Sequence, residues 1–277
     1  NFISQQLRTM MQQQPSLADA TCTDILEGMR KQELAYACSD YLYQDGGRSD
    51  RLNLPQTGIN VSCRTSMMQW MQTVVNFIGL DPETVEISMS YLDRFLESTS
   101  GQEAINCRTV YQLAAMTAFY TAVKITCAEA LTPKLLAELS QGSYHADQFE
   151  EMEVIMLRAL QWRVNPPTAW SFVRETLDVL PQSLFQTEDM RQTVIDMARI
   201  QTDWAVADYE LLTTKKSVIA FAALNNSLRK NRIRFNLFKF LNDATQDKDM
   251  EWDLKQSTLI QKELREALPE GEGMMDM

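Results

Sequence analysis

Side chains that could carry out chemistry on a substrate are few and scattered in this chain of 277 residues. His145 is the only histidine, and no serine or cysteine motif near it suggests a nucleophilic site. The sequence has no glycine-rich phosphate loop, no G-x-S-x-G or H-E-x-x-H motif, and no aspartate-rich pair of the kind that all-helical prenyl-chain enzymes use on magnesium. We therefore predict that the protein is not an enzyme and holds no cofactor.

The cysteines are the other reactive side chains, and they lie far apart, at Cys22, Cys38, Cys63, Cys107 and Cys127. Because their number is odd and no C-x-x-C pair occurs, neither a disulfide framework nor a metal site is expected. A reducing compartment follows, so we expect the nucleus and cytoplasm. No signal peptide or membrane-spanning segment is visible, and we expect no membrane partner.

Charge narrows the choice of partners further. The formal net charge of -11 at pH 7 disfavours nucleic-acid binding, which needs a basic surface that releases counterions, and it suits a basic protein partner. One stretch is locally basic, with Lys215, Lys216, Arg229, Lys230, Arg232, Arg234 and Lys239. We interpret these residues as a solvated helix end; the alternative is a nuclear-localisation or phosphate-docking patch.

The elements that must position these side chains are predicted to be helices. The chain has only 9 glycines and 8 prolines against 16 methionines, and no strand-like alternation persists for more than a few residues. Residues 109–125 are apolar on every face of a helix and carry no charge before Lys124, so we predict the central helix of a bundle. A second alanine-rich stretch, residues 217–228, suggests that one bundle unit is used twice.

Two helices are predicted before the central one. The first runs from Ser62 to Ile78, with Ser62 as its N-cap and Gly79 as its stop. The second begins at the Asp81–Glu83 turn, where proline suits the first helical turn. Residues 98–106 are then expected to form a loop that leads into the central helix.

Two more helices are predicted after the central one. A short helix starts at Pro133 and ends near Gly142, and Asp147 is expected to cap the next helix. Five helices then make one complete unit. Pro166 and Pro167 break the continuation of the fifth helix, so the crossing to the second unit is predicted near residues 165–168.

The motifs on these helices resemble those of the cyclin family. Residues 63–71 are similar to the family's first box helix, and Ser-Tyr-Leu-Asp-Arg-Phe-Leu at residues 90–96 is the most specific match. Residues 112–124 resemble the third helix, and residues 152–172 resemble the fifth helix and the crossing into a second box. A weaker likeness to the second box lies in residues 208–220.

The resemblance implies an all-α fold of two consecutive five-helix cyclin boxes with an N-terminal helical extension. We assign residues 1–33 to the extension, 34–165 to the N-terminal box, 166–269 to a C-terminal cyclin-like box and 270–277 to an acidic tail. The implied function is that of a non-catalytic regulatory subunit. Such a subunit binds and allosterically activates a cyclin-dependent serine/threonine protein kinase in cell-cycle control.

The resemblance also implies roles for single residues. Arg64 and Asp93 match a buried ion pair that fixes the first helix against the second, and Leu113 matches a core position. Lys124 and Glu153 match the pair that grips the regulatory helix of the kinase. We expect Lys124 and Glu153 to lie close together at the ends of the third and fifth helices, outside the core.

A second surface implied by the resemblance is a shallow apolar groove that docks Arg-x-Leu motifs of substrates or inhibitors. Cys63, Met67, Trp70 and Gln112 match its positions. The family tends to have a glutamate three residues after the groove tryptophan, where it pairs with the arginine of the motif. Here that position is Thr73, which carries no charge.

The kinase-gripping region also departs from the family. Where family members often have two glutamates shortly after the gripping lysine, this chain has Thr126 and Cys127. The departure predicts weaker kinase contacts or an unusual kinase partner. The alternative reading is a transcription or scaffold protein with the double cyclin fold and no cell-cycle kinase.

Overall fold

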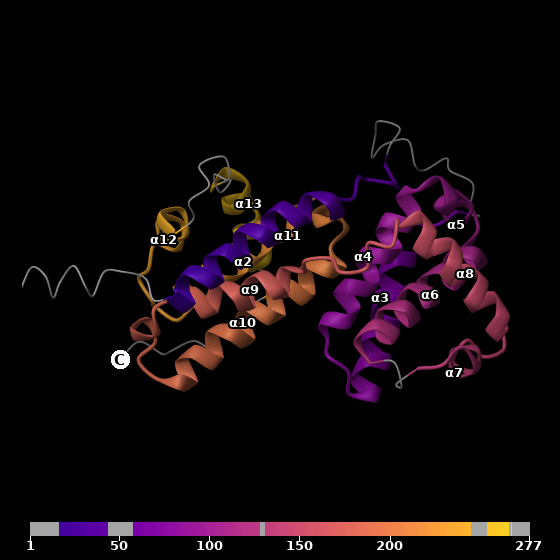
Figure 1. Cartoon of the computed structure of the whole chain (residues 1–277), viewed down its shortest axis with the longest axis horizontal. Coiled ribbons are helices and arrows are strands. Elements are labelled where there is room, and N and C mark those ends of the chain that lie inside the picture. Colours follow the sequence, from indigo (N-terminus) through magenta and orange to yellow (C-terminus); the bar gives the residue numbers. More distant parts are fainter. Residues whose placement is uncertain (1–16, 44–57, 128–130, 245–253, 266, 268–277) are drawn as a thin grey trace, which may run out of the picture.

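The computed structural model describes residues 17–43, 58–127, 131–244, 254–265 and 267. Within this part of the chain every regular element is a helix (Figure 1). The predicted all-α class is therefore confirmed. Among the same residues, no helix combines the length and the apolar character needed to cross a membrane.

The first unit, drawn on the right in Figure 1, is built around α6. Its helices are α3 (Val61–Ile78), α4 (Glu83–Glu97), α5 (Gln102–Asn106), α6 (Arg108–Thr126), α7 (Pro133–Leu139) and α8 (Ala146–Ala159). Helix α6 contacts all five of the others, and residues 114–123 are all buried. The predicted central helix is confirmed.

The interior of the first unit tolerates polar residues on α6 because the helix satisfies them itself. The hydroxyl of Thr117 donates to the Leu113 carbonyl at 2.8 Å, and that of Thr121 donates to the Thr117 carbonyl at 2.9 Å. Neither hydroxyl is therefore left unpaired in the core. Small alanine side chains on the same helix let its neighbours approach closely.

The second unit, on the left in Figure 1, is built around α11. Its helices are α9 (Ala169–Val179), α10 (Glu188–Ala207), α11 (Lys216–Lys230), α12 (Leu237–Ala244) and α13 (Leu254–Arg265). Helix α11 packs against α9, α10 and α13, and every residue from 217 to 228 is buried. This confirms the second apolar helix inferred from the alanine-rich stretch.

Helix α2 (Leu17–Glu33) precedes the first unit in the sequence but packs on the second. It runs alongside α9 and α11, and Leu26 is buried in the core that α9, α10, α11 and α12 form (Figure 1). A short 3₁₀ turn, η1 (Leu34–Tyr36), then leads toward the first unit. Helix α2 therefore lies in the second unit, and η1 connects it to the first.

Two carboxylates bind the starts of helices in the second unit, and one of them reaches across from the first unit. Glu86 of α4 accepts the backbone N–H of Ala169 at 2.7 Å, where α9 begins. Glu33 at the end of α2 accepts the backbone N–H of Ser217 at 3.0 Å and its hydroxyl at 2.6 Å, where α11 begins. Both carboxylates thus meet the unpaired N–H groups and positive end of a helix dipole.

The predicted N-cap of α3 was wrong by two residues. Asn60, not Ser62, is the N-cap: its backbone is extended, and its side chain accepts the N–H of Cys63 at 3.0 Å. An amide oxygen at this position reaches the third helical N–H as well as a serine hydroxyl does, so sequence alone did not separate the two candidates. The predicted stop at Gly79 is confirmed, with φ of 77°.

The loop predicted for residues 98–106 was also wrong. This segment forms a 3₁₀ turn, η3 (Thr99–Gly101), followed by α5. A Cβ atom on Gly101 would lie 2.0 Å from the carbonyl oxygen of Phe95, so the turn packs directly on the end of α4. Gly101 is needed for this close packing, because any larger residue would clash with the backbone of α4.

The predicted cap of α8 lies two residues earlier than expected. His145 is the N-cap, and its backbone N–H donates to the side chain of Gln148 at 2.8 Å. Asp147 lies inside the first turn, where its negative charge suits the helix dipole. Pro166 and Pro167 fall in the helix-free segment between α8 and α9.

Candidate functional site

The first candidate pair, Arg64 and Asp93, is buried between α3 and α4. Nε of Arg64 donates to Oδ1 of Asp93 at 2.9 Å, and a terminal guanidinium nitrogen donates to Oδ2 at 2.8 Å. The other terminal nitrogen donates to the carbonyl of Val206 on α10, and the hydroxyl of Tyr41 donates to Asp93 at 2.8 Å. The pair therefore links the two helices to each other and to the second unit.

The partner carboxylate favours the charged form of Arg64. The two side chains are only 4% and 5% exposed. Burial acts to lower the pKa of Arg64, but the charge and hydrogen bonds of Asp93 outweigh it and raise the pKa above its ordinary value. A buried guanidinium whose three nitrogens each donate to a group of the protein is suited to structural support, as the resemblance implied, and offers little to a partner protein.

The second candidate pair, Lys124 and Glu153, joins α6 to α8. The lysine Nζ lies 3.2 and 3.0 Å from the two carboxylate oxygens and 5.5 Å from the ring centre of Tyr120. The hydrogen bond to Glu153 raises the pKa of Lys124. The predicted proximity of the two side chains is confirmed.

Their predicted placement needs correction. Lys124 lies in the last turn of α6, but Glu153 lies in the middle of α8 rather than at its end. The side chain of Lys124 is 49% exposed, whereas that of Glu153 is 11% exposed. Glu153 therefore belongs to the buried side of the contact, and Lys124 alone extends from it into solvent.

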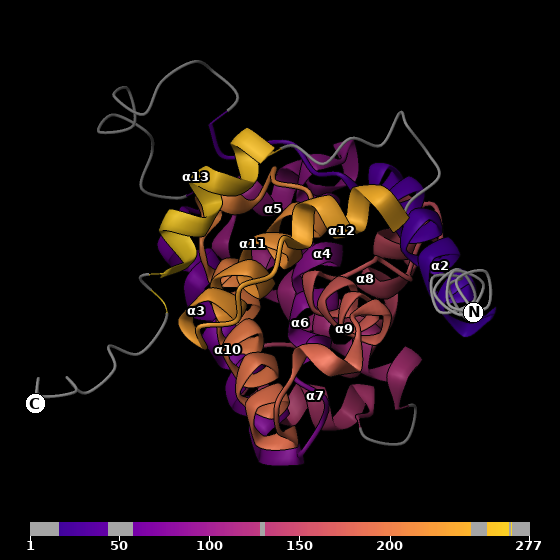
Figure 2. The same cartoon turned by 90° about the vertical axis from the view of Figure 1, so that its left-hand side faces the viewer.

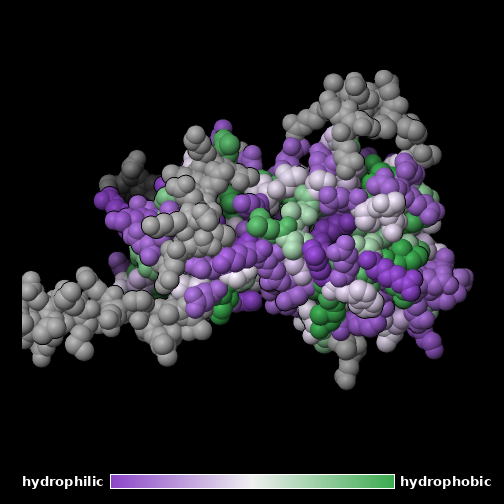
Figure 3. Space-filling model, turned by 45° about the horizontal axis from the view of Figure 1, so that its top comes forward, coloured by the Kyte–Doolittle hydropathy of each residue, from purple (hydrophilic) through white to green (hydrophobic). Residues whose placement is uncertain are grey.

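Large apolar side chains are exposed on the elements that carry this pair. Ile125 and Val154 follow Lys124 and Glu153 directly and are 51% and 43% exposed, and Trp162, just beyond α8, is 67% exposed. Exposed apolar groups next to a charged pair are typical of a protein-binding surface. Figure 3 shows hydrophobic residues gathering over the first unit and its junction with the second.

Trp162 was not among the residues that sequence reasoning assigned to a site. Its backbone has a φ of 59°, and its N–H donates to the Leu157 carbonyl at 3.0 Å, which closes the end of α8. A tryptophan held there in the left-handed region is unusual. The available sequence signal was a tryptophan between polar neighbours, Gln161 and Arg163, with no apolar stripe to bury it.

The predicted docking-groove residues lie on α3 and α6. Cys63, Met67 and Trp70 are spaced four and three residues apart on α3, so they share one face, and all three are half-buried. The ring of Trp70 meets that of Phe119 on α6 edge-on at 5.5 Å. Gln112, also on α6, is exposed, so the structure places all four residues on adjoining helices.

The residues next to the predicted groove determine which groups a docked motif would meet. Leu113, expected in the core, is half-buried against it. Thr73 is exposed, and its hydroxyl donates to the carbonyl of Gln69 in its own helix at 2.9 Å. The side chain of Gln112 accepts the hydroxyl of Tyr144 at 3.2 Å. This face of α3 therefore offers apolar contact without the acidic group that an arginine-containing motif would need.

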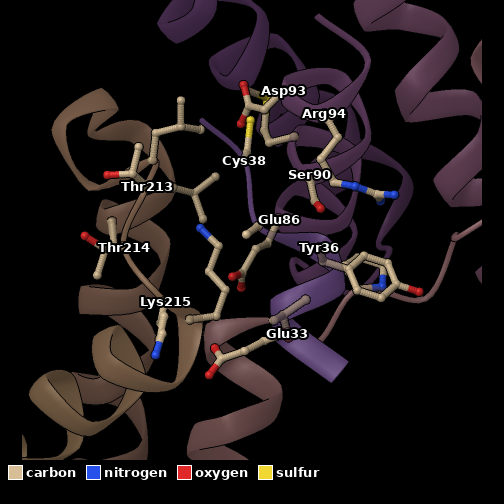
Figure 4. Close-up of a pocket in the computed structure, with 18 of the residues that line it drawn as sticks. Glu33, Tyr36, Cys38, Glu86, Ser90, Asp93, Arg94, Thr213, Thr214 and Lys215 are labelled. Atoms are coloured by element: carbon tan, nitrogen blue, oxygen red, sulfur yellow. The ribbon is translucent and has the colours of Figure 1, made fainter. Parts of the chain in front are cut away.

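A cavity of about 180 Å³ lies between the two units (Figure 4). Its charged lining groups are largely engaged by the protein. Glu33 and Glu86 bind helix starts, and Arg94 donates to the carbonyl of Arg163 at 3.0 Å. Burial raises the pKa of Glu86 above its ordinary value, with nearby Lys216 acting in the opposite direction. We assign this cavity to the junction that positions the units.

Residues 24–165 match the family described as cyclin, N-terminal domain. The chain is 27% identical over 212 residues to cyclin-A1-2 of Oryza sativa subsp. japonica, which covers 76% of this chain and 40% of that protein. It is 25% identical over 209 residues to G1/S-specific cyclin-E1 of Danio rerio, which covers 69% of this chain and 48% of that protein.

These curated relatives are longer proteins, and the chain spans less than half the length of each of the two. Among solved structures, a viral cyclin from herpesvirus saimiri matches with a TM-score of 0.57. That match has 18% sequence identity and covers 76% of this chain and 88% of the viral chain. At this identity the likeness concerns the fold.

Proposed function

The chain belongs to the cyclin family, and from this premise we propose that it binds and allosterically activates a cyclin-dependent serine/threonine protein kinase in cell-cycle control. The observation that carries the proposal is the pair of Lys124 and Glu153. The lysine is half-exposed, the carboxylate that holds it is almost buried, and each is followed directly in the sequence by an exposed apolar residue. The A-type and E-type cyclins among its relatives support the cell-cycle assignment.

In this proposal the chain supplies no chemistry. A protein kinase needs its own Lys–Glu ion pair formed and its activation loop clear before the phosphates of ATP are held correctly. A subunit that binds the active placement of the kinase helix more tightly than the inactive one shifts the equilibrium. Moving a kinase from about 1% to about 99% active requires roughly 5.5 kcal/mol of differential affinity.

The geometry of the pair suits contact with a helix backbone. The ammonium of Lys124 has three N–H donors, and its exposed side leaves capacity for a carbonyl oxygen of the kinase. Glu153 can accept a backbone N–H while it holds the lysine. Charge-assisted hydrogen bonds of this kind contribute roughly 1.5 to 3 kcal/mol each.

The apolar neighbours add to the proposed kinase contact. Trp162 presents a large ring at the end of α8, and Ile125 extends the surface past Lys124. Tryptophan is the side chain most enriched among the residues that dominate binding energy at protein interfaces. Ile125 offers apolar area directly before Thr126 and Cys127, which stand where the family has glutamates, and this suits a kinase contact that is less electrostatic.

An activation assay tests the proposed function. The purified chain is mixed with individual cyclin-dependent kinases and ATP, and phosphorylation of a serine/threonine peptide is measured with and without the chain. We expect activation of at least one kinase, lost in the double variant Lys124→Ala/Glu153→Ala. The matched control, Lys134→Ala/Glu138→Ala, changes one exposed lysine and one exposed glutamate on α7 and should activate normally.

Phosphorylation by the chain with no kinase present would refute the regulatory role. Failure to bind or activate any cyclin-dependent kinase would instead favour the alternative, a scaffold or transcription protein with the same fold. A tagged chain recovered from dividing cells would separate these readings by the partners it carries, since a protein kinase should be prominent among them. The same cells would test the proposed nuclear and cytoplasmic location by microscopy.

We also propose that Cys63, Met67, Trp70 and Gln112 dock substrates or inhibitors through an apolar motif. The shared face on α3 and the contact between Trp70 and Phe119 support it. Met67→Ala/Trp70→Ala should leave kinase binding nearly unchanged and reduce phosphorylation only of substrates that dock. Because both side chains pack partly on the core, the unfolding temperature of the variant is measured first, and equal phosphorylation of all substrates would refute docking here.

A further inference from the structure

Five cations gather at the end of α11 and in the segment that follows it. We call this the basic patch; it consists of Arg229, Lys230, Arg232, Arg234 and Lys239. All five are exposed. Among the residues that the structure describes, no hydrogen bond or ion pair is formed by the side chains of Arg229, Arg232, Arg234 and Lys239.

The structure divides the basic stretch seen in the sequence. Lys215 and Lys216 lie at the start of α11, beside the cavity between the units, whereas the basic patch lies at the other end of this 15-residue helix. Figure 2 looks onto that end of the molecule, with α12 across the front. Helices α6 and α8, which carry Lys124 and Glu153, lie in the other unit (Figure 1). The patch is therefore separate from the proposed kinase contact.

A solvated helix end accounts for only part of the patch. Arg229 and Lys230 stand in the last turn of α11, where positive charge suits the helix dipole. Arg232 and Arg234 lie beyond the helix, where the dipole effect has faded. Their charges need another explanation.

The segment after α11 is held as a fixed ribbon that alternates between core and solvent. Ile233 and Phe235 are half-buried against the core of the second unit, while Arg232 and Arg234 are exposed. The N–H of Ile233 donates to the Leu228 carbonyl at 2.9 Å. Two residues of chain span at most about 7 Å, so the two arginines start close together on a rigid support.

Arg232 occupies a backbone position that favours glycine. Its φ is 59°, and its N–H donates to the Arg229 carbonyl at 3.0 Å, which closes the end of α11. The corresponding turn after α3 uses Gly79, with φ of 77°. A Cβ atom is disfavoured in this region, so an arginine here runs against local preference, as functional residues often do.

The chemistry of the patch selects a phosphate ligand. Three of its five cations are arginines, whose planar guanidinium groups bind phosphate oxygens through two parallel hydrogen bonds. Taking the five positive charges of the patch from the net charge of -11 leaves -16 on the rest of the chain. A long nucleic acid would be repelled by that surrounding charge, whereas a short phosphorylated segment fits within the patch.

An import receptor that binds a basic segment in extended form is a poorer fit. Such binding would require Ile233 and Phe235 to leave the core of the second unit. The ring of Phe235 also packs against that of Phe240 on α12, with centroids 5.3 Å apart. The segment therefore exposes Arg232 and Arg234 while it stays packed on the second unit.

We propose that the basic patch is a docking surface for a partner protein segment that carries phosphoserine or phosphothreonine at closely spaced positions. Arg232 and Arg234 bind the phosphates, and Arg229 and Lys239 add positive charge around them. The proposal concerns the chain alone and does not depend on kinase binding.

Fluorescence anisotropy with the purified full chain tests the proposal. The probe is a short labelled peptide with phosphoserine at two alternate positions in a neutral background. We expect it to bind at least about tenfold more tightly than the unphosphorylated peptide and than a twin with glutamate at both positions. Arg232→Gln/Arg234→Gln should weaken binding of the phosphorylated probe by at least about tenfold.

The matched control is Lys134→Gln/Lys262→Gln, which removes two exposed lysines elsewhere and should bind the probe like the parent. Arg234→Gln alone leaves the strained turn at Arg232 intact and should weaken binding by at least about threefold, which covers a double variant that folds poorly. Equal binding by these arginine variants, or equal affinity for the unphosphorylated or glutamate peptide, would overturn the proposal. Tighter binding of an RNA oligonucleotide with the same charge would overturn it in favour of nucleic acid.

Discussion

Two ion pairs in the first unit look alike in sequence and differ in what they can do. Arg64 and Asp93 are 29 residues apart and so are Lys124 and Glu153, and in both pairs the charged atoms lie about 3 Å apart. The first pair is 4% and 5% exposed, while the second is 49% and 11% exposed. Burial rather than distance therefore separates the two.

The surroundings of each pair explain the difference in role. Arg64 donates hydrogen bonds to Asp93 and to the carbonyl of Val206, and Asp93 also accepts one from the hydroxyl of Tyr41. The hydrogen bonds of this pair are therefore all formed within the protein. The ammonium of Lys124 is held by Glu153 and lies near the ring of Tyr120, but the lysine side chain is 49% exposed and can meet a partner.

The largest effect should come from breaking the buried pair. Asp93→Ala leaves the guanidinium of Arg64 buried without its counter-charge and removes the acceptor of the Tyr41 hydroxyl. We expect the free energy of unfolding to fall by about 3 to 5 kcal/mol in urea titrations. A loss below about 1 kcal/mol would show that water or another group compensates the charge of Arg64. The structural role assigned to the Arg64–Asp93 pair would then be wrong.

A double variant sharpens this result. Arg64→Met/Asp93→Leu removes both charges and fills the space with apolar atoms, and it should be less destabilised than Asp93→Ala alone. If the double variant loses as much as or more than the single one, the hydrogen bonds to Val206 and Tyr41 dominate the stability, and the unpaired charge does not.

The sequence allowed the main helices and the pairing of these charges to be predicted. The central helices α6 and α11 were recognisable because residues on every face are apolar, which few surface helices tolerate. The motif containing Asp93 identified the family, and the family then placed Arg64, Lys124 and Glu153. Local patterns and a resemblance were sufficient wherever the signal lay in a single helix.

What could not be predicted depends on contacts between distant segments. The packing of α2 on the second unit is set by the burial of Leu26 among residues far along the chain. The burial of Glu153 depends on how α8 lies against α6, and helical periodicity does not determine that angle. The left-handed backbone at Trp162 and Arg232 appears only when the ends of α8 and α11 are built.

The next largest loss of stability should come from replacing Glu153, the buried member of the second pair. Glu153→Ala removes a side chain that is 11% exposed, so it should destabilise the protein by about 1 to 2 kcal/mol and also weaken kinase binding. Thermal and urea unfolding provide the measurement. A variant as stable as the parent would mean that Glu153, like Lys124, belongs to the exposed side of the contact.

Glu86 is a third buried carboxylate, and among the described residues it has no guanidinium partner, so its effect on stability should depend on pH. Glu86 binds the start of α9, faces Lys216 and Glu83, and has a pKa raised mainly by burial. Its protonated form is therefore favoured on folding, and that stabilisation is present below its unfolded pKa and lost as the pH rises through the raised value.

Glu86→Gln keeps an acceptor for the Ala169 N–H but cannot ionise. Relative to the parent, the variant should gain stability as the pH rises from about 4 toward 7, because only the parent must ionise a buried group. Urea titrations across this range compare the two proteins. A difference that does not change with pH would indicate that Glu86 keeps an ordinary pKa in the folded protein.

The smallest effect on stability should come from Lys124→Ala, together with a large effect on binding. The lysine side chain is 49% exposed and pairs with Glu153 from the solvent side, so the free energy of unfolding should change by less than about 0.5 kcal/mol. Kinase affinity, measured by titration calorimetry with the kinase activated in the assay above, should fall at least about tenfold because a charge-assisted hydrogen bond is lost. Lys134→Ala removes an exposed lysine from α7 and should change neither quantity. Should Lys124→Ala bind the kinase as tightly as the parent, the two pairs would no longer differ in role, and the kinase contact would have to lie elsewhere on the first unit, with Trp162 the next residue to replace.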